Sequence, residues 1–265
     1  MYHAVGKPHD RRFTRWVVSP SLLAEQLAAL REAKYELIGL SEWVRRTQAP
    51  RPSEQATQDT ARCAVLTFDD GYADFAEHAL PILLSHDASA TAYIVTGYVG
   101  ASASWLPFGA ERARPTMTWD DLRTISASGI EIGSHGHRHI ELDAVRSEVA
   151  EQDVRDSVRS LSAQGLPPRS FCYPFGYSSL RVRKIVASAR FETACVVSRG
   201  LADPARDMLR VRRLEVQHKT TPEMLLRRFE APAVSVNTRL KDAAQPAWRL
   251  MRRLRSTTQA ARTDQ

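Results

Sequence analysis

Cysteine is scarce in this chain. Only three occur among 265 residues, Cys63, Cys172 and Cys195, and each lies within or beside an apolar segment. Their wide spacing argues against a disulfide framework and against a zinc site built from cysteine pairs. We therefore expect the three thiols to be small buried side chains.

Long hydrophobic runs are also absent. No stretch approaches the roughly eighteen consecutive apolar residues that a membrane-spanning helix requires. The first residues, Met1 to Val5, lack the charged and then apolar layout of a secretory signal. We expect a cytoplasmic protein, or a peripheral one at the inner membrane face, and an exported one only if the true start lies upstream of Met1.

The composition is typical of a folded protein with an excess of basic residues. Hydrophobic residues make up 43% of the chain, enough for a substantial core in one large domain or two small ones. The formal net charge is +7, and the excess lies largely between Arg206 and Arg255. A basic surface suits a nucleic acid, an anionic membrane or an acidic glycan. Charge is the only feature that favours a nucleic acid, and charge alone is weak evidence. We therefore expect no nucleic-acid partner.

Short apolar runs alternate with helical patterns along most of the chain. Such alternation predicts a parallel sheet with crossover helices, either a barrel or a doubly wound sheet. The predicted strands are residues 2–5, 35–38, 64–68, 90–95, 130–134, 170–173, 192–197 and 213–216. The predicted helices are residues 20–33, 41–46, 75–85, 119–128, 144–163 and 179–189.

Two segments depart from this alternation. Residues 48–61 are rich in Pro, Gln, Ser and Thr, which predicts an exposed loop and the best internal linker. Near the end, Trp248–Arg255 interleaves apolar and arginine residues, which predicts a short basic amphipathic helix before a polar tail. This helix is either solvated or in contact with a membrane surface or a partner. The predicted organisation is a domain over residues 1–235, followed by the basic helix and flexible tail over residues 236–265.

Carboxylates and imidazoles directly follow predicted strands. Asp69 and Asp70 come after one strand, and His135 and His139 come after another. Parallel α/β folds build their sites at the carboxyl ends of strands, so these side chains are expected on one face. Asp, His and His are a common ligand set for a divalent ion with an open coordination position, and a second Asp supplies a base. The combination predicts a metal-dependent hydrolase.

Three short segments carry the most specific pattern. They are Thr67–Gly71 (TFDDG), Ser134–His139 (SHGHRH) and Phe171–Gly176 (FCYPFG). With them, the sequence resembles the polysaccharide deacetylases, also called the NodB-homology family or family 4 carbohydrate esterases. The resemblance extends from Tyr2 to about Val216. It implies an α/β fold, a distorted (β/α) TIM-like barrel of the NodB-homology type.

The resemblance also implies a role for each matching residue. Asp70, His135 and His139 would bind the metal, most often zinc, and Asp69 would be the catalytic base. The metal and the backbone N–H of Phe175 would then stabilise the oxyanion of the tetrahedral intermediate. Pro174 and Gly176 would shape the loop that carries Phe175.

Aromatic residues near the predicted cleft suit stacking against a sugar ring. Tyr72 follows the Asp pair, and we expect it to contact substrate together with Pro174, Phe175 and Gly176. Trp119 lies just after Thr118, which is a good helix N-cap, so a core position is favoured for that indole.

Two positions depart from the family pattern. Many members have an Arg two residues before the Pro of the third motif, where it orients the base, and this chain has Cys172 there. Arg213 resembles a late-strand Arg of members that carry Tyr-Pro-Phe-Gly, so it is the predicted substitute; a surface arginine is the alternative. The later Leu-x-His motif, which supplies the general acid, is not clear. His218 is the only histidine in that region, so it is the candidate acid, with an exposed residue as the alternative.

The leading functional hypothesis is hydrolysis of N-acetyl groups from an amino sugar, in a polysaccharide or a glycan precursor, with metal-activated water and Asp69 as base. Hydrolysis of another C–N amide or of an O-acetyl ester is an alternative, because the metal motif does not read the acyl donor. A catalytically weak module that binds glycans or docks at a membrane through Trp248–Arg255 is another.

Overall fold

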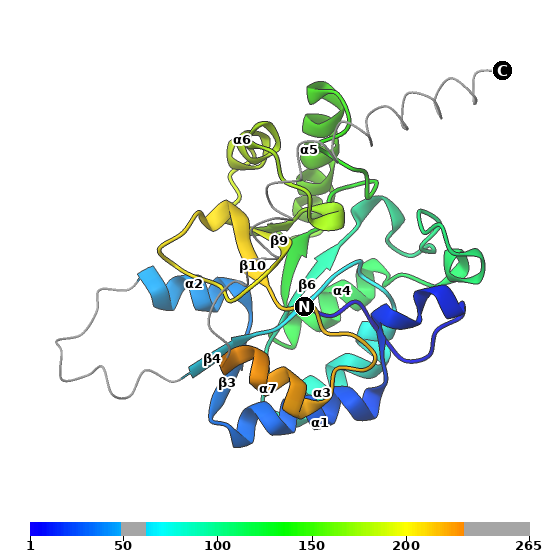
Figure 1. The fold of residues 1–265 in the computed structure, drawn as a ribbon. Helices are drawn as coiled ribbons and strands as arrows, with labels where there is room; N and C mark the ends of the chain where they lie inside the picture. The colour runs from blue at the N-terminus through cyan, green and yellow to red at the C-terminus, as the bar shows by residue number, and fades with distance from the viewer. Residues whose placement is uncertain (49–61, 231–265) are drawn as a thin grey trace.

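A curled sheet of six parallel strands forms the centre of the protein. The computed structural model describes residues 1–48 and 62–230. The sheet order is β10-β9-β8-β7-β6-β5, and every neighbouring pair is parallel (Figure 1). This arrangement is a half-barrel surrounded by helices, so the predicted distorted (β/α) barrel is confirmed. The strands are β5 (Thr67–Phe68), β6 (Thr91–Ile94), β7 (Glu131–Ser134), β8 (Ser170–Cys172), β9 (Thr193–Arg199) and β10 (Val211–Arg213).

Two shorter pairs of parallel strands accompany the sheet. The N-terminal segment also links the two edges of the half-barrel: the Tyr2 N–H donates to the Thr67 carbonyl at 2.8 Å, and the Val216 N–H donates to the Met1 carbonyl at 2.9 Å. Residues 1 and 2 therefore lie between β5 and the end of β10. The shorter pairs are β1 (Ala4–Val5) with β2 (Val17–Val18), and β3 (Tyr35–Ile38) with β4 (Arg62–Val65).

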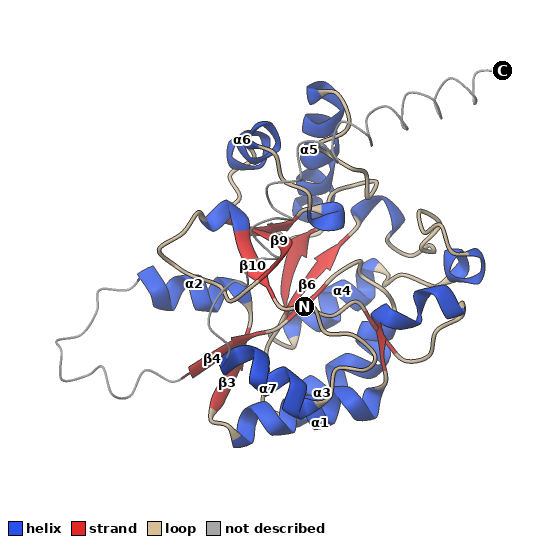
Figure 2. Ribbon diagram, in the orientation of Figure 1, coloured by secondary structure: helices blue, strands red, loops and turns tan. Residues whose placement is uncertain are grey.

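Helices surround the strands (Figure 2). Helix α1 begins where Ser19 caps it, since the hydroxyl accepts the Leu22 N–H at 3.2 Å and Pro20 suits the first turn. Helix α4 begins with a capping box between Thr118 and Asp121. The helices are α1 (Pro20–Glu32), α2 (Leu40–Gln48), α3 (Leu80–Ser85), α4 (Trp119–Ala127), α5 (Ser147–Ala163), α6 (Leu180–Ser188) and α7 (Pro222–Glu230).

The hydrophobic core has two main parts. The larger part packs residues of α1, α3, α4 and α7, such as Leu27 and Leu83, against the β5 and β6 side of the sheet. The second part packs α5 and α6 against β8 and β9, with Val154, Phe171 and Val186 fully buried. These two layers hold the sheet from outside and leave the carboxyl ends of its strands to form a site.

Two predicted elements need correction, and one helix was missed. The late strand predicted over residues 213–216 is wrong, because β10 spans Val211–Arg213 and the chain then turns to the N-terminal segment. The run predicted over residues 64–68 is two strands, since Leu66 donates its N–H to β3 and its carbonyl accepts from β6. Helix α7 was not predicted, although Thr221 followed by Pro222 is typical of a helix start.

Several predictions concern residues outside the described part of the chain. They are the loop predicted over residues 48–61, of which only Gln48 is described and ends α2, the domain boundary at residue 235 and the basic helix Trp248–Arg255. Within residues 1–48 and 62–230, no helix is long and apolar enough to cross a bilayer.

Candidate active site

Three side chains that the sequence predicted as metal ligands meet beyond the ends of β5 and β7. Asp70 Oδ1 lies 3.4 Å from His135 Nε2 and 3.3 Å from His139 Nε2. Four ligands bonded to zinc at roughly 2.0–2.2 Å in a tetrahedron would lie about 3.4 Å apart. The side chains are at most 7% exposed, and the three ligand atoms lie within 4.8 Å of one another. The donor set therefore fits a divalent cation.

The backbone around two of these ligands adopts an uncommon conformation. Asp70 has φ 77° and His139 has φ 54°, both in the left-handed region that side chains with a Cβ rarely occupy. Each such residue costs about 1–3 kcal/mol and persists only where the surrounding structure requires it. The strain therefore coincides with the convergence of the ligands.

Neighbouring groups orient Asp70 and His135. A carbonyl can only accept, so His135 Nδ1–H donates to the Cys172 carbonyl at 2.7 Å and leaves the Nε2 lone pair for a ligand. The Tyr72 hydroxyl donates to Asp70 Oδ2 at 2.7 Å, while Oδ1 faces the histidines. These contacts hold both ligands in the form that binds a cation.

Aromatic rings pack on His139. Its ring centroid lies 5.4 Å from that of Trp105 and 4.7 Å from that of Phe175. The His139 Nδ1 and the Trp105 Nε1 are both buried and have no hydrogen-bond partner among the described residues. Buried donors of this kind normally have an acceptor, so oxygen atoms of a ligand or of water would be favoured beside them.

Arg213 holds the other carboxylate of the pair. Its guanidinium contacts Asp69 through both terminal nitrogens, Nη1 to Oδ1 at 2.7 Å and Nη2 to Oδ2 at 2.8 Å. Burial opposes ionisation of Asp69, but the charge and hydrogen bonds of Arg213 lower its pKa to about 2. Asp69 is therefore an anion at neutral pH. The contact matches the position that the sequence predicted for Arg213; its catalytic role stays a prediction.

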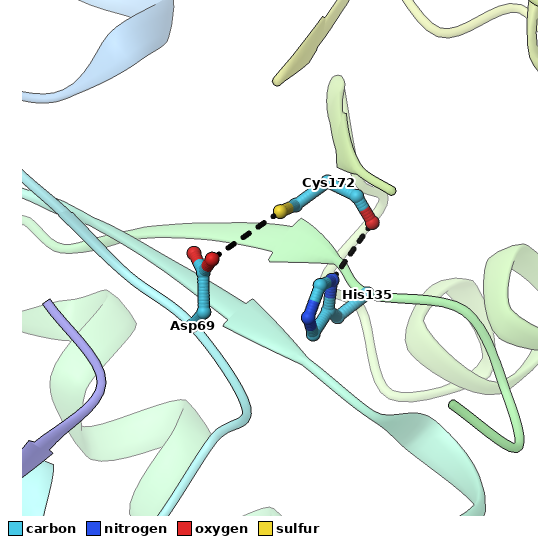
Figure 3. Close-up of side chains that lie close together, drawn as sticks. All are labelled: Asp69, His135 and Cys172. Carbon is cyan, nitrogen blue, oxygen red and sulfur yellow. Dashed lines mark hydrogen bonds between the residues drawn. The ribbon is translucent and has the colours of Figure 1, made fainter. Parts of the chain in front are cut away.

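Cys172 contacts both Asp69 and His135, as Figure 3 shows. Its thiol donates to Asp69 Oδ2 at 3.5 Å. These three residues are also close enough to hold a cation. However, Arg213 Nη2 lies 3.1 Å from the thiol and 2.8 Å from Asp69, so a positive charge already occupies this position. Repulsion favours the Asp70, His135 and His139 cluster for an ion.

The pKa values of the cluster follow from these contacts. Burial raises the pKa of Asp70, but hydrogen bonds from His135 and His139 outweigh this effect and lower the pKa well below its usual value. Burial lowers the pKa of His139, and the contact with Asp70 offsets only part of that. Burial alone would lower the pKa of His135, but Cys172 and Asp70 raise it well above its usual value. A cation binds the neutral imidazole, so its binding would compete with protonation of His135.

The predicted substrate contacts are only partly accessible. Phe175 is 48% exposed and has φ 58°, while Pro174 and Gly176 beside it are buried. Tyr72 is 1% exposed, and its hydroxyl contacts Asp70, so these contacts give no support to its predicted contact with substrate, which stays a prediction. The phenol is hidden because Trp105 stacks on it, with ring centroids 6.3 Å apart.

The candidate acid His218 is not brought to this cluster. Its backbone N–H donates to the Arg15 carbonyl at 3.3 Å, and its Nδ1 is buried with no partner in residues 1–48 and 62–230. No hydrogen bond or ring contact joins it to Asp69 or to the three ligands in the described part of the chain. Its place, in the loop after β10, gives no support to a role in proton transfer.

His3 is the residue that sequence reasoning missed. The Asp69 N–H donates to the Tyr2 carbonyl at 3.0 Å, which places His3 beside the Asp pair. Its electrostatic interaction is the smallest of the named influences on the pKa of Asp69 and of Asp70, and its Nδ1 is buried without a partner among the described residues. The sequence feature that could have indicated His3 is its position in the predicted first strand. However, nothing in the neighbouring residues indicates that this strand lies beside β5.

The sequence matches a known family over just over half of its length. The family model described as polysaccharide deacetylase matches residues 56–194. The Bacillus subtilis (strain 168) protein YxkH is 23% identical over 171 residues, which cover 64% of this chain and 54% of that protein. The poly-beta-1,6-N-acetyl-D-glucosamine N-deacetylase of Escherichia coli (strain K12) is 30% identical over 145 residues, 52% of this chain and 20% of that protein. The match thus spans about half of the first relative and a fifth of the second.

Solved structures share the fold. The Streptococcus pyogenes deacetylase PplD in complex with acetate superposes with a TM-score of 0.72 at 24% identity, covering 87% of this chain and 96% of that one. IcaB from Ammonifex degensii superposes with a TM-score of 0.68 at 22% identity, covering 87% and 95%. At these identities the likeness establishes the barrel and leaves the chemistry to the site.

Proposed function

This chain belongs to the polysaccharide deacetylase family, and from that premise we propose that it hydrolyses N-acetyl groups of an amino-sugar polymer or glycan precursor at a divalent-cation centre. One observation carries the proposal. The Oδ1 of Asp70 lies 3.3–3.4 Å from the Nε2 atoms of two histidines, next to a second carboxylate that Arg213 holds as an anion.

The residues divide the chemistry among them. A divalent cation held by Asp70, His135 and His139, with zinc the best fit, would supply a Lewis acid for the acetamide carbonyl and make water more acidic. Asp69 would accept the proton of the attacking water, because Arg213 keeps it ionised and in place. The backbone N–H of Phe175 would donate to the developing oxyanion.

His3 is our candidate for the proton donor to the leaving amine. An acid is needed because an amine leaves more easily when protonated. His3 lies next to the Asp pair through the pairing of Tyr2 with β5, whereas His218 has no contact with the cluster in the described residues. We expect His3→Ala to lower kcat by about 10²-fold or more, as loss of a general acid does, and His218→Ala to leave it nearly unchanged. The reverse result would assign the acid to His218.

Acetate release tests the proposal directly. Purified protein should release acetate from N-acetylglucosamine oligomers and polymers. The panel should include poly-β-1,6-N-acetyl-D-glucosamine, which the name of the Escherichia coli relative suggests. Chelator should abolish the release, and Asp69→Asn should lower kcat at least about 10²-fold while the protein retains its ion. An Asp69→Asn enzyme with wild-type activity would reject the assigned base.

The control is a carboxylate away from the site. Asp120 lies in the first turn of α4 with its side chain 88% exposed, so Asp120→Asn should change neither activity nor ion content. O-acetylated sugars and other amides in the panel test the alternative acyl donors. Stoichiometric ion with no hydrolysis of any acylated sugar would favour a glycan-binding module over an enzyme.

A further inference from the structure

A buried carboxylate on α5 contacts the loop that carries both histidine ligands. Asp153 is 0% exposed. Its Oδ2 accepts the His137 N–H at 2.9 Å, and its Oδ1 accepts the Arg138 N–H and the Arg138 Nε–H, each at 3.0 Å. Consecutive backbone N–H groups that share one anion form a compact concave arrangement of donors. The two peptide groups between the ligands are therefore bound to a side chain from another element.

The opposite side of the same loop is bound as well. The Gly136 carbonyl accepts the Thr96 N–H at 3.1 Å, and the His137 carbonyl accepts the Gly97 N–H at 2.8 Å. The loop thus directs N–H groups toward α5 and carbonyls toward the segment that follows β6. Hydrogen bonds on both sides leave its peptide groups little freedom to rotate.

Gly136 shows how closely the loop approaches the carboxylate. Its φ is 76°, and a Cβ added there would lie 2.7 Å from Asp153 Oδ2. Its N–H donates to Ser134 Oγ at 3.2 Å, and Ser134 donates in turn to Ser157 Oγ at 2.7 Å. Asp153 and Ser157 lie one turn apart on α5, so one helix face organises the loop from its first ligand onward.

We propose that Asp153 is a positioning residue for the metal centre. By binding the peptide groups of His137 and Arg138, it sets the separation of His135 and His139 before any ion arrives. A loop ordered in advance does not lose its conformational entropy on binding, so the affinity for the ion is higher. The inference rests on the proposed function, because it assumes that these histidines hold a cation.

The test is the affinity of the full chain for Zn²⁺, measured by competition with a chromogenic chelator. Asp153→Asn keeps the volume but replaces one acceptor oxygen with an amide donor that faces backbone N–H groups. We expect zinc binding to weaken about 10- to 100-fold, as for other residues that support metal ligands. The matched control is Asp156→Asn on the same helix, since that side chain is 26% exposed, accepts a hydrogen bond from Gln152 and pairs with Arg159. Its zinc affinity should stay within about twofold of wild type.

The outcomes separate the two proposals. A wild-type protein that binds no zinc would overturn the proposed function together with this inference. A wild type that binds tightly and an Asp153→Asn protein that binds equally well would overturn this inference alone. A lower unfolding midpoint with unchanged zinc affinity would mean that Asp153 is merely structural, which also overturns it.

A second measurement uses the wild-type protein alone and does not depend on whether the variant folds. Backbone hydrogen exchange at His137 and Arg138 reports whether their N–H groups are bound before an ion is present. We expect slow exchange at both residues in the zinc-free protein, with little change when zinc is added. Rapid exchange that becomes slow only with zinc would show that the ion orders the loop, and would overturn the inference.

Discussion

At the scale of single residues, Arg213 determines the state of the proposed base. It is 7% exposed, and besides Asp69 it contacts the Thr67 hydroxyl at 3.1 Å and the Val196 carbonyl at 3.3 Å. A lysine there would carry the charge but could meet only part of this set, because it lacks the planar fork of donors. Asp69 depends on that fork for its orientation as well as for its charge.

Arg213→Lys should therefore impair catalysis more than substrate binding. We expect kcat to fall roughly 10- to 100-fold with KM little changed, and the free energy of unfolding to fall by about 1–3 kcal/mol because buried acceptors lose a donor. Steady-state kinetics and urea denaturation measure the two effects. Arg159→Lys, at a side chain 71% exposed, is the control. A kcat within twofold of wild type would contradict the positioning of Asp69 by Arg213.

Trp105 offers a second test at this scale. Its indole stacks on Tyr72 and touches His139, while its Nε1–H has no partner among the described residues. If an oxygen of the sugar accepts that proton, Trp105→Phe should raise KM about fivefold, which corresponds to about 1 kcal/mol for one hydrogen bond, and leave kcat nearly unchanged. Trp119→Phe, which packs partly against the core, is the matched control. An unchanged KM in Trp105→Phe would leave the indole a packing role only.

At the scale of elements, the long connection between β6 and α4 carries Trp105 and is fastened by a buried ion network. Glu111 is 0% exposed and accepts the Asp10 N–H at 2.9 Å and Arg114 Nε–H at 2.7 Å. Arg114 also contacts Asp74 at 2.7 Å. The network joins the connection to the segment after β1 and to the segment that follows the Asp pair.

Glu111 makes this fastening depend on pH. Burial raises the pKa of Glu111, but hydrogen bonds from Arg114 and Asp10 outweigh this effect and lower the pKa below its usual 4.5. A carboxyl with a lowered pKa in the folded state stabilises the fold above about pH 4.5, and this contribution is lost as pH falls below that value. Glu111→Gln should thus be less stable than wild type at pH 7, and the difference in unfolding free energy should shrink as pH falls below about 4.5. Urea denaturation across pH 3–7, with the exposed Glu25→Gln as control, measures this; a pH-independent difference would contradict it.

At the scale of the whole molecule, an ion at the cluster would join loops from separate strands. Asp70 follows β5, whereas His135 and His139 follow β7. A ligand that binds only the folded state stabilises it by about 2.7 kcal/mol at a hundred times its Kd. For a protein of this size, we expect Zn²⁺ at that concentration to raise the unfolding midpoint by roughly 5–10 °C.

Thermal unfolding with and without zinc checks this expectation. His139→Ala should lose most of the shift, because a ligand is removed from a cluster of three. The exposed His78→Ala should keep the shift in full. Equal shifts in both variants would mean that zinc binds elsewhere on the chain.

The sequence predicted those parts of the site that short motifs and predicted strands indicate. Strands of one parallel sheet precede Asp69, Asp70, His135 and His139. Their convergence could therefore be predicted from the alternation of strand and helix patterns along the sequence. Phe175 could be assigned to a turn at the end of β8 for the same reason. The end of the last strand was misplaced because Arg213–Val216 alternates charged and apolar residues as a strand does, but leaves the sheet after Arg213 and contacts Met1.

Other residues of the site could not be assigned from local pattern. Asp153 reads in sequence as a polar residue of an amphipathic helix, and only its distance from the His137 N–H gives it a role. His3 acquires a neighbour only because Tyr2 lies between β5 and the end of β10. Tyr72 was assigned to the substrate, but the stacked Trp105 buries it and turns its hydroxyl to Asp70.

By itself, then, the sequence determined the alternation of strands and helices, the family and the candidate ligand set, because periodicity and short motifs are properties of neighbouring residues. Only the tertiary structure decided which distant groups act on those ligands: Arg213 on Asp69, Cys172 on His135 and Asp153 on the loop between the histidines. The physical reason is that hydrogen bonds and charges act over a few ångströms in space. Residues separated by up to 144 positions come within that range only when the sheet curls.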